Sequence, residues 1–306
     1  MNTADAIKTQ ELTRRYANVT AVDELSWIAP EGSACGLLGP NGAGKSTTLK
    51  MLMGMVFPDA GNAEVLGFDI SRQSLEIRKR VAFVPDNKDL YHQMKAGKFL
   101  EWYSRFFPEW SGHVAQELIC RWNLPLEKKI SELSKGNKSK LIFCAVFARH
   151  PQMLLMDEPS EGLDPESIED LLAAITHWSA GGNRTSILAT HRLDEVERIC
   201  DWVTIIHEGK VQVNENLDDL KAKWKTIQVI GETPVPELKN WKDVYDVRKD
   251  GWTTVIISAS DAETLAGRLR EQFHLANVTV HDMSLREIYL SIVRRGRDYD
   301  FLKNME

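Results

Sequence analysis

The residues best suited to chemistry form a glycine-rich loop at positions 39–47, which satisfies the pattern GxxxxGK[ST]. The loop lies between an apolar strand-like stretch and a helix start, the context in which this pattern binds phosphates. Glycines let backbone N–H groups turn toward phosphate oxygens, and the helix N-terminus adds partial positive charge. We expect Lys45 to reach the β- and γ-phosphates of a nucleotide and Ser46 to ligate Mg²⁺. The expected phosphate-binding residues are Gly39, Pro40, Asn41, Gly42, Ala43, Gly44, Lys45, Ser46 and Thr47.

A second candidate element is a compact apolar run, residues 153–156, that ends in two acids. Asp157, at the end of a buried strand, could hold Mg²⁺ opposite the glycine loop. Glu158, one residue further on, could act as a general base on a water in line with the γ-phosphate. Two acids that end a strand are often only solvated, but the neighbouring loop favours a nucleotide site.

A third element, residues 133–137, precedes an apolar helical stretch. Ser134 and the backbone amides near Gly136 predict a helix start that binds an anion. Taken alone, the segment would be an N-cap followed by a polar first turn.

The elements that must position these residues alternate between helix and strand. Strand-forming stretches broken by a turn precede the glycine loop between residues 21 and 38, and a helical insert covers residues 88–148. The alternation predicts a parallel α/β sheet, as in a P-loop nucleotide-binding domain. The expected helices are 46–56, 96–107, 113–122, 138–149, 167–178 and 194–199, and the expected strands are 81–85, 153–156, 185–190 and 202–207.

The pattern changes near residue 220, so we expect domains at residues 1–218 and 219–306. The second is predicted as a small α+β domain with strands 227–230, 244–247, 255–258 and 278–281, a turn at Asp250 and Gly251, and helices 262–273 and 285–294. The last helix combines apolar residues with a basic end that could suit a membrane surface, although packing on the small domain is the simpler role. That basic end comprises Arg294, Arg295 and Arg297.

Bulk composition limits the classes of protein. The 306 residues are 43% hydrophobic and 27% charged, as in an ordinary globular protein. A net charge of -6 argues against wrapping DNA or RNA, so no nucleic acid is expected as a partner. The start of the chain lacks the apolar core of a signal peptide, and no apolar run approaches the ~20 residues that span a bilayer. We expect an intracellular protein whose membrane role comes through a partner. Its widely spaced cysteines, expected to be reduced thiols, are Cys35, Cys120, Cys144 and Cys200.

The segments GPNGAGKST, LSKGN, LLMDEP, residues 160–164 and the histidine after ILAT occur in this order. Over about residues 5–215, the chain resembles the ATP-binding subunit of ABC transporters. The resemblance implies a P-loop cassette with N-terminal antiparallel strands, which binds ATP with Mg²⁺. By similarity, Tyr16 would stack on adenine, and His191 would hold the γ-phosphate and orient Glu158. Without the resemblance, each would be an unremarkable residue next to a strand.

The same resemblance implies a head-to-tail dimer with two ATP molecules between the chains. The segment that would contact the γ-phosphate held by a second subunit comprises Ser134, Lys135, Gly136 and Asn137, here called the signature segment. Asp164 would lie at that interface. Lys135 and Asn137 replace the family's usual glycine and glutamine, but Ser134 and Gly136 are retained, so we expect activity to survive.

A larger departure is Asp86, which stands where the family has a glutamine after strand 81–85. A carboxylate can still reach Mg²⁺ through water, and we expect Asp86 to tune the hydrolysis rate. Asn87 and Gln93 are alternatives if the loop is shifted.

Two sets of apolar residues have a structural alternative. An aromatic run in the helical insert could dock a short helix of a membrane subunit, as the resemblance implies, although internal packing is the simpler role. Its members are Trp102, Tyr103, Phe106, Phe107 and Trp110. Met51, Met53 and Met55 are predicted to be helix and core residues, not a metal site.

The leading hypothesis is an ATP hydrolase that powers transport by a separate membrane permease, on the inner face of the cell membrane. A single cassette with a small C-terminal domain resembles bacterial exporters of the drug- and peptide-resistance kind. Two alternatives stay open: a soluble ABC ATPase acting on ribosomes or DNA, and a regulatory subunit that binds ATP without hydrolysis.

Overall fold

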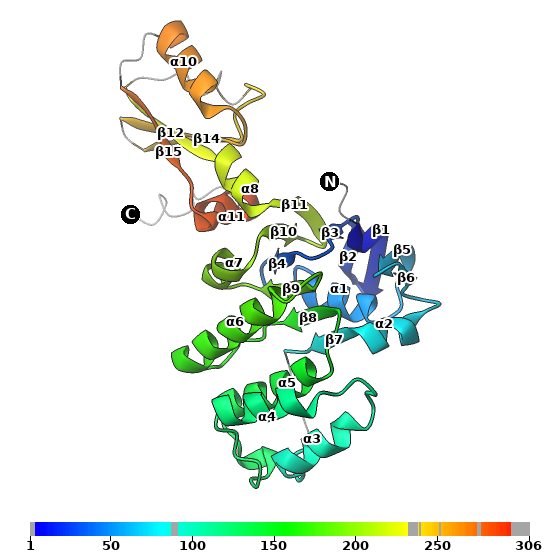
Figure 1. Cartoon of the computed structure of the whole chain (residues 1–306). Coiled ribbons are helices and arrows are strands. Elements are labelled where there is room, and N and C mark those ends of the chain that lie inside the picture. The colour runs from blue at the N-terminus through cyan, green and yellow to red at the C-terminus, as the bar shows by residue number, and fades with distance from the viewer. Residues whose placement is uncertain are drawn as a thin grey trace. The chain divides into compact units, whose positions relative to one another are not determined.

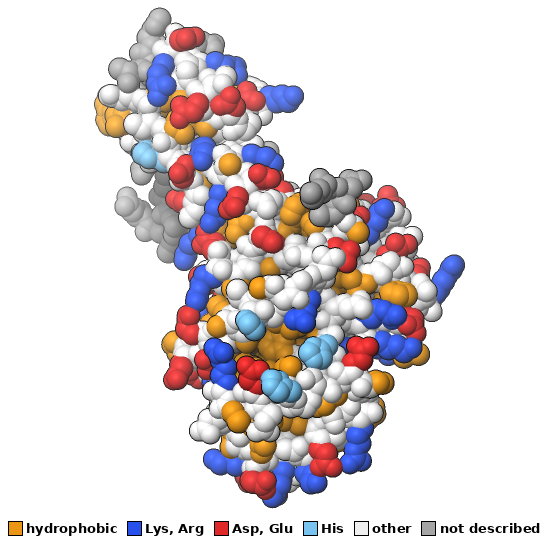
Figure 2. All heavy atoms as spheres, viewed as in Figure 1, with side chains coloured by type: hydrophobic (Ala, Val, Ile, Leu, Met, Phe, Trp, Pro, Cys, Tyr) orange, Lys and Arg blue, Asp and Glu red, His pale blue; other side chains and the backbone are white. Residues whose placement is uncertain are grey.

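A computed structural model describes residues 4–86, 91–231, 238, 240–250, 252–273 and 277–294. The chain divides into two compact units, Met1–Asn214 and Glu215–Glu306. The drawn face in Figure 2 carries interspersed basic and acidic side chains on both units. Among the described residues, no helix has the length and apolar character needed to cross a bilayer.

The first unit is built on a six-stranded sheet of order β11-β10-β4-β9-β8-β7. Neighbouring strands from β10 to β7 pair in parallel, which confirms the predicted α/β class. The central strands are apolar because both faces of a parallel sheet are covered, and residues 153–156 are fully buried. The strands are β4 (Ala34–Leu38), β7 (Val81–Val84), β8 (Met153–Asp157), β9 (Thr185–Thr190), β10 (Trp202–His207) and β11 (Lys210–Asn216).

Helices α1 (Lys45–Leu52) and α7 (Leu193–Ile199) pack on this sheet, and α6 (Pro165–Ser179) packs against α7. Gly36 of β4 allows α7 to approach closely, since a Cβ there would collide with Val196. The predicted continuation of α1 to residue 56 is wrong, because Gly54 takes a left-handed conformation at φ +60° and the helix ends at Leu52. Met51 and Met53 are buried as expected, but Met55 lies beyond the helix and is 52% exposed.

An antiparallel sheet of order β2-β1-β5-β6, with β3 also paired to β1, forms the N-terminal layer. Trp27 is buried and donates from Nε1 to the Thr204 hydroxyl of β10 at 2.8 Å. This bond joins the layer to the parallel sheet. The strands are β1 (Asp5–Tyr16), β2 (Val19–Leu25), β3 (Ile28–Pro30), β5 (Ala60–Val65) and β6 (Phe68–Asp69).

A helical region lies at the lower end of this unit in Figure 1. Helix α5 is buried from Leu141 to Ala148, which explains its uniformly apolar sequence. The helices are α2 (Ser74–Arg80), α3 (Ala96–Ser104), α4 (Gly112–Arg121), the 3₁₀ turn η1 (Ile130–Glu132) and α5 (Lys135–Ala148). The predicted helices at 96–107 and 113–122 therefore exist, but α3 ends three residues early.

The aromatic run of this region packs largely on itself. Trp102 meets Phe106 with ring centroids 4.9 Å apart, and Tyr103 meets Phe107 at 5.0 Å. Phe106 nevertheless remains 60% exposed. Internal packing and a free aromatic surface thus coexist in the same run.

The second unit contains an antiparallel sheet of order β13-β14-β12-β15. Helix α10 packs on it through Leu265, Ala266 and Leu269, which share a core with Ile227 and Ile256. The predicted strand 244–247 begins later, because Val244 closes a turn onto Trp241; residues 251, 295 and 297 lie outside the described part. The elements are α8 (Leu217–Lys223), β12 (Lys225–Ile230), β13 (Asp246–Asp250), β14 (Thr253–Ser258), α10 (Ala262–Phe273), β15 (Val278–Asp282) and α11 (Leu285–Val293).

Candidate nucleotide site

The glycine loop connects β4 to α1 and can be built only with glycine at key positions. Gly42 and Gly44 have φ values of +83° and +102°, in the left-handed region that disfavours other residues. A Cβ on Gly44 would also collide with the Ala21 carbonyl. Gly44 is the N-cap of α1 and offers no side chain to the first turn. The first N–H groups of the helix are thus left to a ligand, as an anion site requires.

Lys45 is the first residue of α1 and is only 6% exposed. Its Nζ donates to the Gly39 carbonyl at 2.7 Å and to the Pro40 carbonyl at 3.3 Å. The same atom lies 3.7 Å from Glu158 Oε1. Burial lowers the pKa of Lys45, while Glu158 and Asp157 act in the opposite direction. The ammonium is thus held inside its own loop and next to the acids at the end of β8.

Ser46 and Asp157 come together across the loop, with Ser46 Oγ donating to Asp157 Oδ1 at 2.9 Å. Asp157 is 2% exposed, and burial is the main cause that raises its pKa. Asp86 is exposed but close enough to raise that pKa further. A hydroxyl and carboxylates are the oxygen ligands that Mg²⁺ prefers, so this donor set fits the metal predicted from the sequence.

Of the two alternatives to Asp86, Gln93 is engaged elsewhere. The Gln93 amide oxygen accepts from Lys129 Nζ at 3.3 Å, on the exposed surface. Asn87 lies outside the described residues. Asp86 therefore remains the residue after β7 whose charge reaches Asp157.

Glu158 follows β8 in a left-handed conformation, with φ +43°. This conformation is costly for a residue with a side chain and is found at functional sites. Its N–H donates to the Ala189 carbonyl of β9 at 2.8 Å. Glu158 Oε2 accepts from the Thr190 hydroxyl at 3.1 Å and lies 3.0 Å from His191 Nδ1. The carboxylate is therefore fixed at the mouth of the loop by three neighbours, including Lys45.

The sequence did not single out Thr190 or Glu161 near this carboxylate. Thr190 ends β9, in the ILAT segment that precedes His191, and was given no role of its own. Carboxylate oxygens of Glu158 and Glu161 and a ring nitrogen of His191 all lie within 4.8 Å of one another. Glu161 therefore places a second acid beside the pair predicted to act in hydrolysis.

The signature segment begins helix α5, and Ser134 is its N-cap, accepting from the Asn137 N–H at 3.2 Å. Gly136 faces α6: a Cβ there would lie 2.6 Å from Ser167 Oγ. Asp164 caps α6 by accepting from the Ser167 N–H at 2.9 Å. In the described part of the chain, no hydrogen bond or ion pair joins this segment to residues 39–47. The structure thus brings it to residues 160–164, and not to the glycine loop of the same chain.

Tyr16 ends β1 and is 43% exposed. The Arg14 guanidinium lies over its ring, 4.8 Å from the centroid. Arg14 is itself held by Asp59 at 2.9 Å and by the Phe57 carbonyl at 3.1 Å. Sequence patterns could not link Arg14 to Asp59, which is 45 residues away. The contact leaves Tyr16 supported and still open to solvent.

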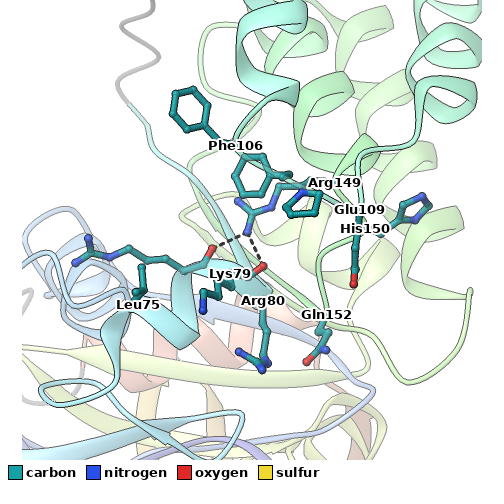
Figure 3. Close-up of a pocket in the computed structure, with 11 residues that line it drawn as sticks. Leu75, Lys79, Arg80, Phe106, Glu109, Arg149, His150 and Gln152 are labelled. Atoms are coloured by element: carbon teal, nitrogen blue, oxygen red, sulfur yellow. Dashed lines mark hydrogen bonds between the residues drawn. The ribbon is translucent and has the colours of Figure 1, made fainter.

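A separate pocket of about 500 Å³ lies where α2 meets the end of α3 and the start of β8. Figure 3 shows the Arg149 guanidinium there, with hydrogen bonds to α2. Arg149 Nη2 donates to the Arg78 carbonyl at 2.8 Å, and its guanidinium lies 4.1 Å from the ring centroid of Phe107. The walls are Leu75, Arg78, Lys79, Arg80, Phe106, Phe107, Pro108, Glu109, Arg149, His150 and Gln152.

Loop, acids and parallel sheet together define a P-loop nucleotide-binding cassette, and comparison with known proteins specifies its kind. The family model described as "ABC transporter" matches residues 22–161. The Nod factor export ATP-binding protein I of Rhizobium etli is 31% identical over 299 residues, covering 95% of this chain and 94% of that protein. The bacitracin transport ATP-binding protein of Bacillus licheniformis is 28% identical, with coverage of 95% and 98%.

Solved structures agree with this fold. An ATP-binding subunit of an ABC transporter superposes with a TM-score of 0.64 and 27% identity, over 71% of this chain and 92% of that one. A dimeric cassette in a post-hydrolysis state, bound to ADP and phosphate, superposes with a TM-score of 0.62 and 20% identity, over 69% and 98%. At that identity the second match shows the fold alone.

The chain belongs to the ABC transporter family, as an ATP-binding subunit. It is an ABC-type ATPase that powers transport by a separate permease.

Proposed function

We propose that this chain drives an exporter and hydrolyses ATP at the ends of β4, β8 and β9, with Glu158 as the general base. The observation that carries the proposal is the fixed Glu158 carboxylate, which touches Thr190 and His191 and faces Lys45. Export is supported by relatives named for Nod factor export and bacitracin transport.

In this mechanism each residue has a distinct task. The amides of residues 39–45 and the Lys45 ammonium bind the β- and γ-phosphates, and Tyr16 stacks on the adenine. Ser46 and Asp157 would hold Mg²⁺, with Asp86 acting through water, and the metal supplies neutralisation of phosphate charge. Glu158 takes a proton from the attacking water, while His191 holds the γ-phosphate and orients Glu158.

The test is Glu158→Gln, which keeps the shape of the side chain and removes its basicity. We expect kcat for ATP hydrolysis to fall about 100-fold or more, because general-base catalysis contributes ~10²–10⁴-fold. ATP affinity, measured with a fluorescent ATP analogue, should stay within about twofold. Glu166→Gln, an exposed acid of the first turn of α6, is the matched control. Hydrolysis by Glu158→Gln at the parent rate would remove Glu158 from its role.

We further propose that the signature segment completes the site of a second subunit, in a homodimer or heterodimer. Ser134, Lys135, Gly136 and Asn137 form a helix start that, among the described residues, makes no hydrogen bond or ion pair with the glycine loop of its own chain, so a ligand held by another chain can reach it. Light scattering on Glu158→Gln should report a dimer with ATP and a monomer without it. A monomer under both conditions would contradict this assembly.

The pocket beside α2 is the proposed docking place for the permease. Exposed apolar side chains flank it, with Leu75 at 65% and Phe106 at 60% exposure. Docking there would keep the chain on the inner face of the cell membrane. We expect Phe106→Ser to lower recovery with membranes that contain the co-expressed permease, while ATPase activity without permease is retained. Unchanged recovery would exclude Phe106 from docking.

We assign these roles to an ATP-binding domain at residues 1–218 and leave residues 219–306 as a small α+β domain.

A further inference from the structure

Glu195 is a buried acid of the first unit that the proposed mechanism does not use. It lies on α7, four residues after His191, and is 0% exposed. Neither of its carboxylate oxygens has a hydrogen-bond partner of good geometry among the described residues. A buried polar group without a partner costs free energy, so its presence in a native core calls for an explanation.

Two neighbours, Arg192 and Ser160, interact with this carboxylate. Arg192 Nε lies 3.0 Å from Glu195 Oε1, in an ion pair whose N–H is not aimed at the oxygen. The second neighbour is the hydroxyl of Ser160, which is also fully buried and also lacks a well-directed partner. Burial is the main cause that raises the pKa of Glu195, and Ser160 lowers it. The two buried groups are thus close enough to interact.

Both neighbours belong to the segments that carry the proposed catalytic pair. Ser160 stands two residues after Glu158, and the Ser160 carbonyl accepts from the Leu163 N–H at 3.1 Å. Arg192 directly follows His191, and its N–H donates to the Thr190 hydroxyl at 3.0 Å. That hydroxyl in turn donates to Glu158 Oε2. Contacts therefore link Glu158 to Thr190 and Thr190 to Arg192. Glu195 interacts with both Arg192 and Ser160, and so connects this chain of contacts to the segment that follows Glu158.

We propose that Glu195 is a positioning residue for ATP hydrolysis: by bridging Ser160 and Arg192 it fixes the turn after Glu158 relative to the turn that carries His191. The inference rests on the proposed roles of Glu158 and His191. Glu195 itself is too deeply buried to touch nucleotide. It acts by holding two short segments at a fixed separation, since small misplacements of reacting groups are costly in rate.

The first experiment is Glu195→Gln, which keeps the shape of the side chain and removes the charge that pairs with Arg192. We expect kcat to fall about tenfold while KM for ATP stays within about twofold, because reacting groups are misplaced and substrate contacts are intact. Asp194→Asn is the matched control, since Asp194 is the neighbouring acid on α7, is 67% exposed and lies 3.8 Å from Arg192. This control should keep the parent kcat.

Thermal unfolding separates positioning from a purely structural role. Since burial raises the pKa of Glu195, the ionised carboxylate destabilises the fold at pH above that raised value. Other charged groups facing it are Arg192, Asp194 and Glu158, of which only the first is basic. Glu195→Gln should therefore have a Tm at pH 8 equal to or above that of the parent, and the difference should shrink toward pH 5. A loss of kcat without a loss of Tm cannot come from unfolding.

Ser160 supplies a second, independent arm. Ser160→Ala should lower kcat severalfold, and Ser160→Thr, which restores the hydroxyl, should recover most of it. The kcat of the double variant Glu195→Gln with Ser160→Ala should be no lower than that of the slower single variant, because both substitutions disrupt the same bridge. Parent-like kcat in Glu195→Gln, a kcat loss matched by a Tm loss, or multiplying single effects would overturn the proposal. These outcomes are distinct from failure of the proposed function, which would appear as undiminished hydrolysis by Glu158→Gln.

Discussion

Helices α1 and α5 both begin with a lysine, but this lysine is buried in α1 and exposed in α5. Lys45 is the first residue of α1 and is buried. Its ammonium donates hydrogen bonds to loop carbonyls and pairs with Glu158. Lys135 opens α5 and is exposed. No acidic side chain of the described residues lies within 4.0 Å of Lys135 Nζ, and its stem lies over Gly162. The chain thus satisfies one cation internally and leaves the other to solvent.

The caps of the two helices differ in the same sense. Gly44 gives α1 no side-chain cap, so the first-turn N–H groups stay available to a phosphate. Ser134 already accepts from the Asn137 N–H, so the start of α5 has fewer donors to offer. This contrast indicates that α1 is the principal phosphate site and that α5 makes a smaller, auxiliary contact. The predictions below test that ranking.

The largest effect is expected for Lys45→Met, which removes the cation of the principal site. We expect ATPase activity to fall about 100-fold or more, because the variant loses the several kcal/mol by which a preorganised charge stabilises the transition state. ATP affinity should fall as well. Steady-state phosphate release and analogue binding measure the two. Lys50→Met, an exposed lysine in the last turn of the same helix, is the control. If Lys45→Met kept a tenth of the activity, the ranking of the two helix starts would be wrong.

A smaller effect is expected for Lys135, and its two truncations differ in meaning. A Cβ on Gly162 would lie 3.1 Å from Lys135 Nζ and 3.2 Å from its Cδ, so the stem covers that glycine. Lys135→Ala removes stem and charge, and we expect kcat to fall about tenfold. Lys135→Met keeps most of the stem and should lose less, about threefold. Lys138→Ala provides a control on the same helix. Equal losses in both Lys135 variants would mean that only the charge matters.

The sequence could predict those parts of the site that local chemistry determines. A glycine loop between strand and helix and two acids after an apolar strand have a fixed local geometry, and the structure brings Asp157 and Glu158 next to the loop. It could not predict the contacts of Arg14 with Asp59, of Lys135 with Gly162, or of Glu195 with Ser160. Those pairs are far apart along the chain and meet only through tertiary packing, which leaves no periodic pattern.

The errors have the same origin. Met55 fits a helical pattern, but the left-handed Gly54 ends the helix before it and leaves it exposed. Charged residues scattered without a period of two obscured β1 in the sequence, and the antiparallel partners β2 and β5 stabilise this strand. Asp86 could be named from its place after β7, yet its proximity to Asp157 depends on the pairing of β7 with β8. Local patterns thus identify residue types, and packing decides their neighbours.

Asp86→Gln tests how the metal is bound at the principal site, and the expected effect is moderate. Asp86 adds negative charge near Asp157, and this charge attracts a divalent cation. With the neutral amide we expect the half-saturating Mg²⁺ concentration for ATPase activity to rise about threefold, and kcat to change with it. A Mg²⁺ titration at saturating ATP measures both. Gln93→Ala, whose side chain is directed to Lys129, is the control. Unchanged kinetics would show that Asp86 is only a solvated acid.

The smallest effect is expected at the adenine end of the same site, for Arg14→Leu. Arg14 lies over the Tyr16 ring and is fixed by Asp59, so it holds the platform on which we expect adenine to stack. A partly exposed cation–π contact is worth about 0.5–1 kcal/mol, which corresponds to a rise of about two- to fivefold in KM for ATP at constant kcat. Arg15→Leu is the control, because only the backbone of Arg15 contacts Asp59. Inorganic triphosphate has no adenine to stack on Tyr16. Its binding should therefore be the same in Arg14→Leu and in the parent protein. If triphosphate binding weakened as much as ATP binding, Arg14 would act on the loop and not through Tyr16.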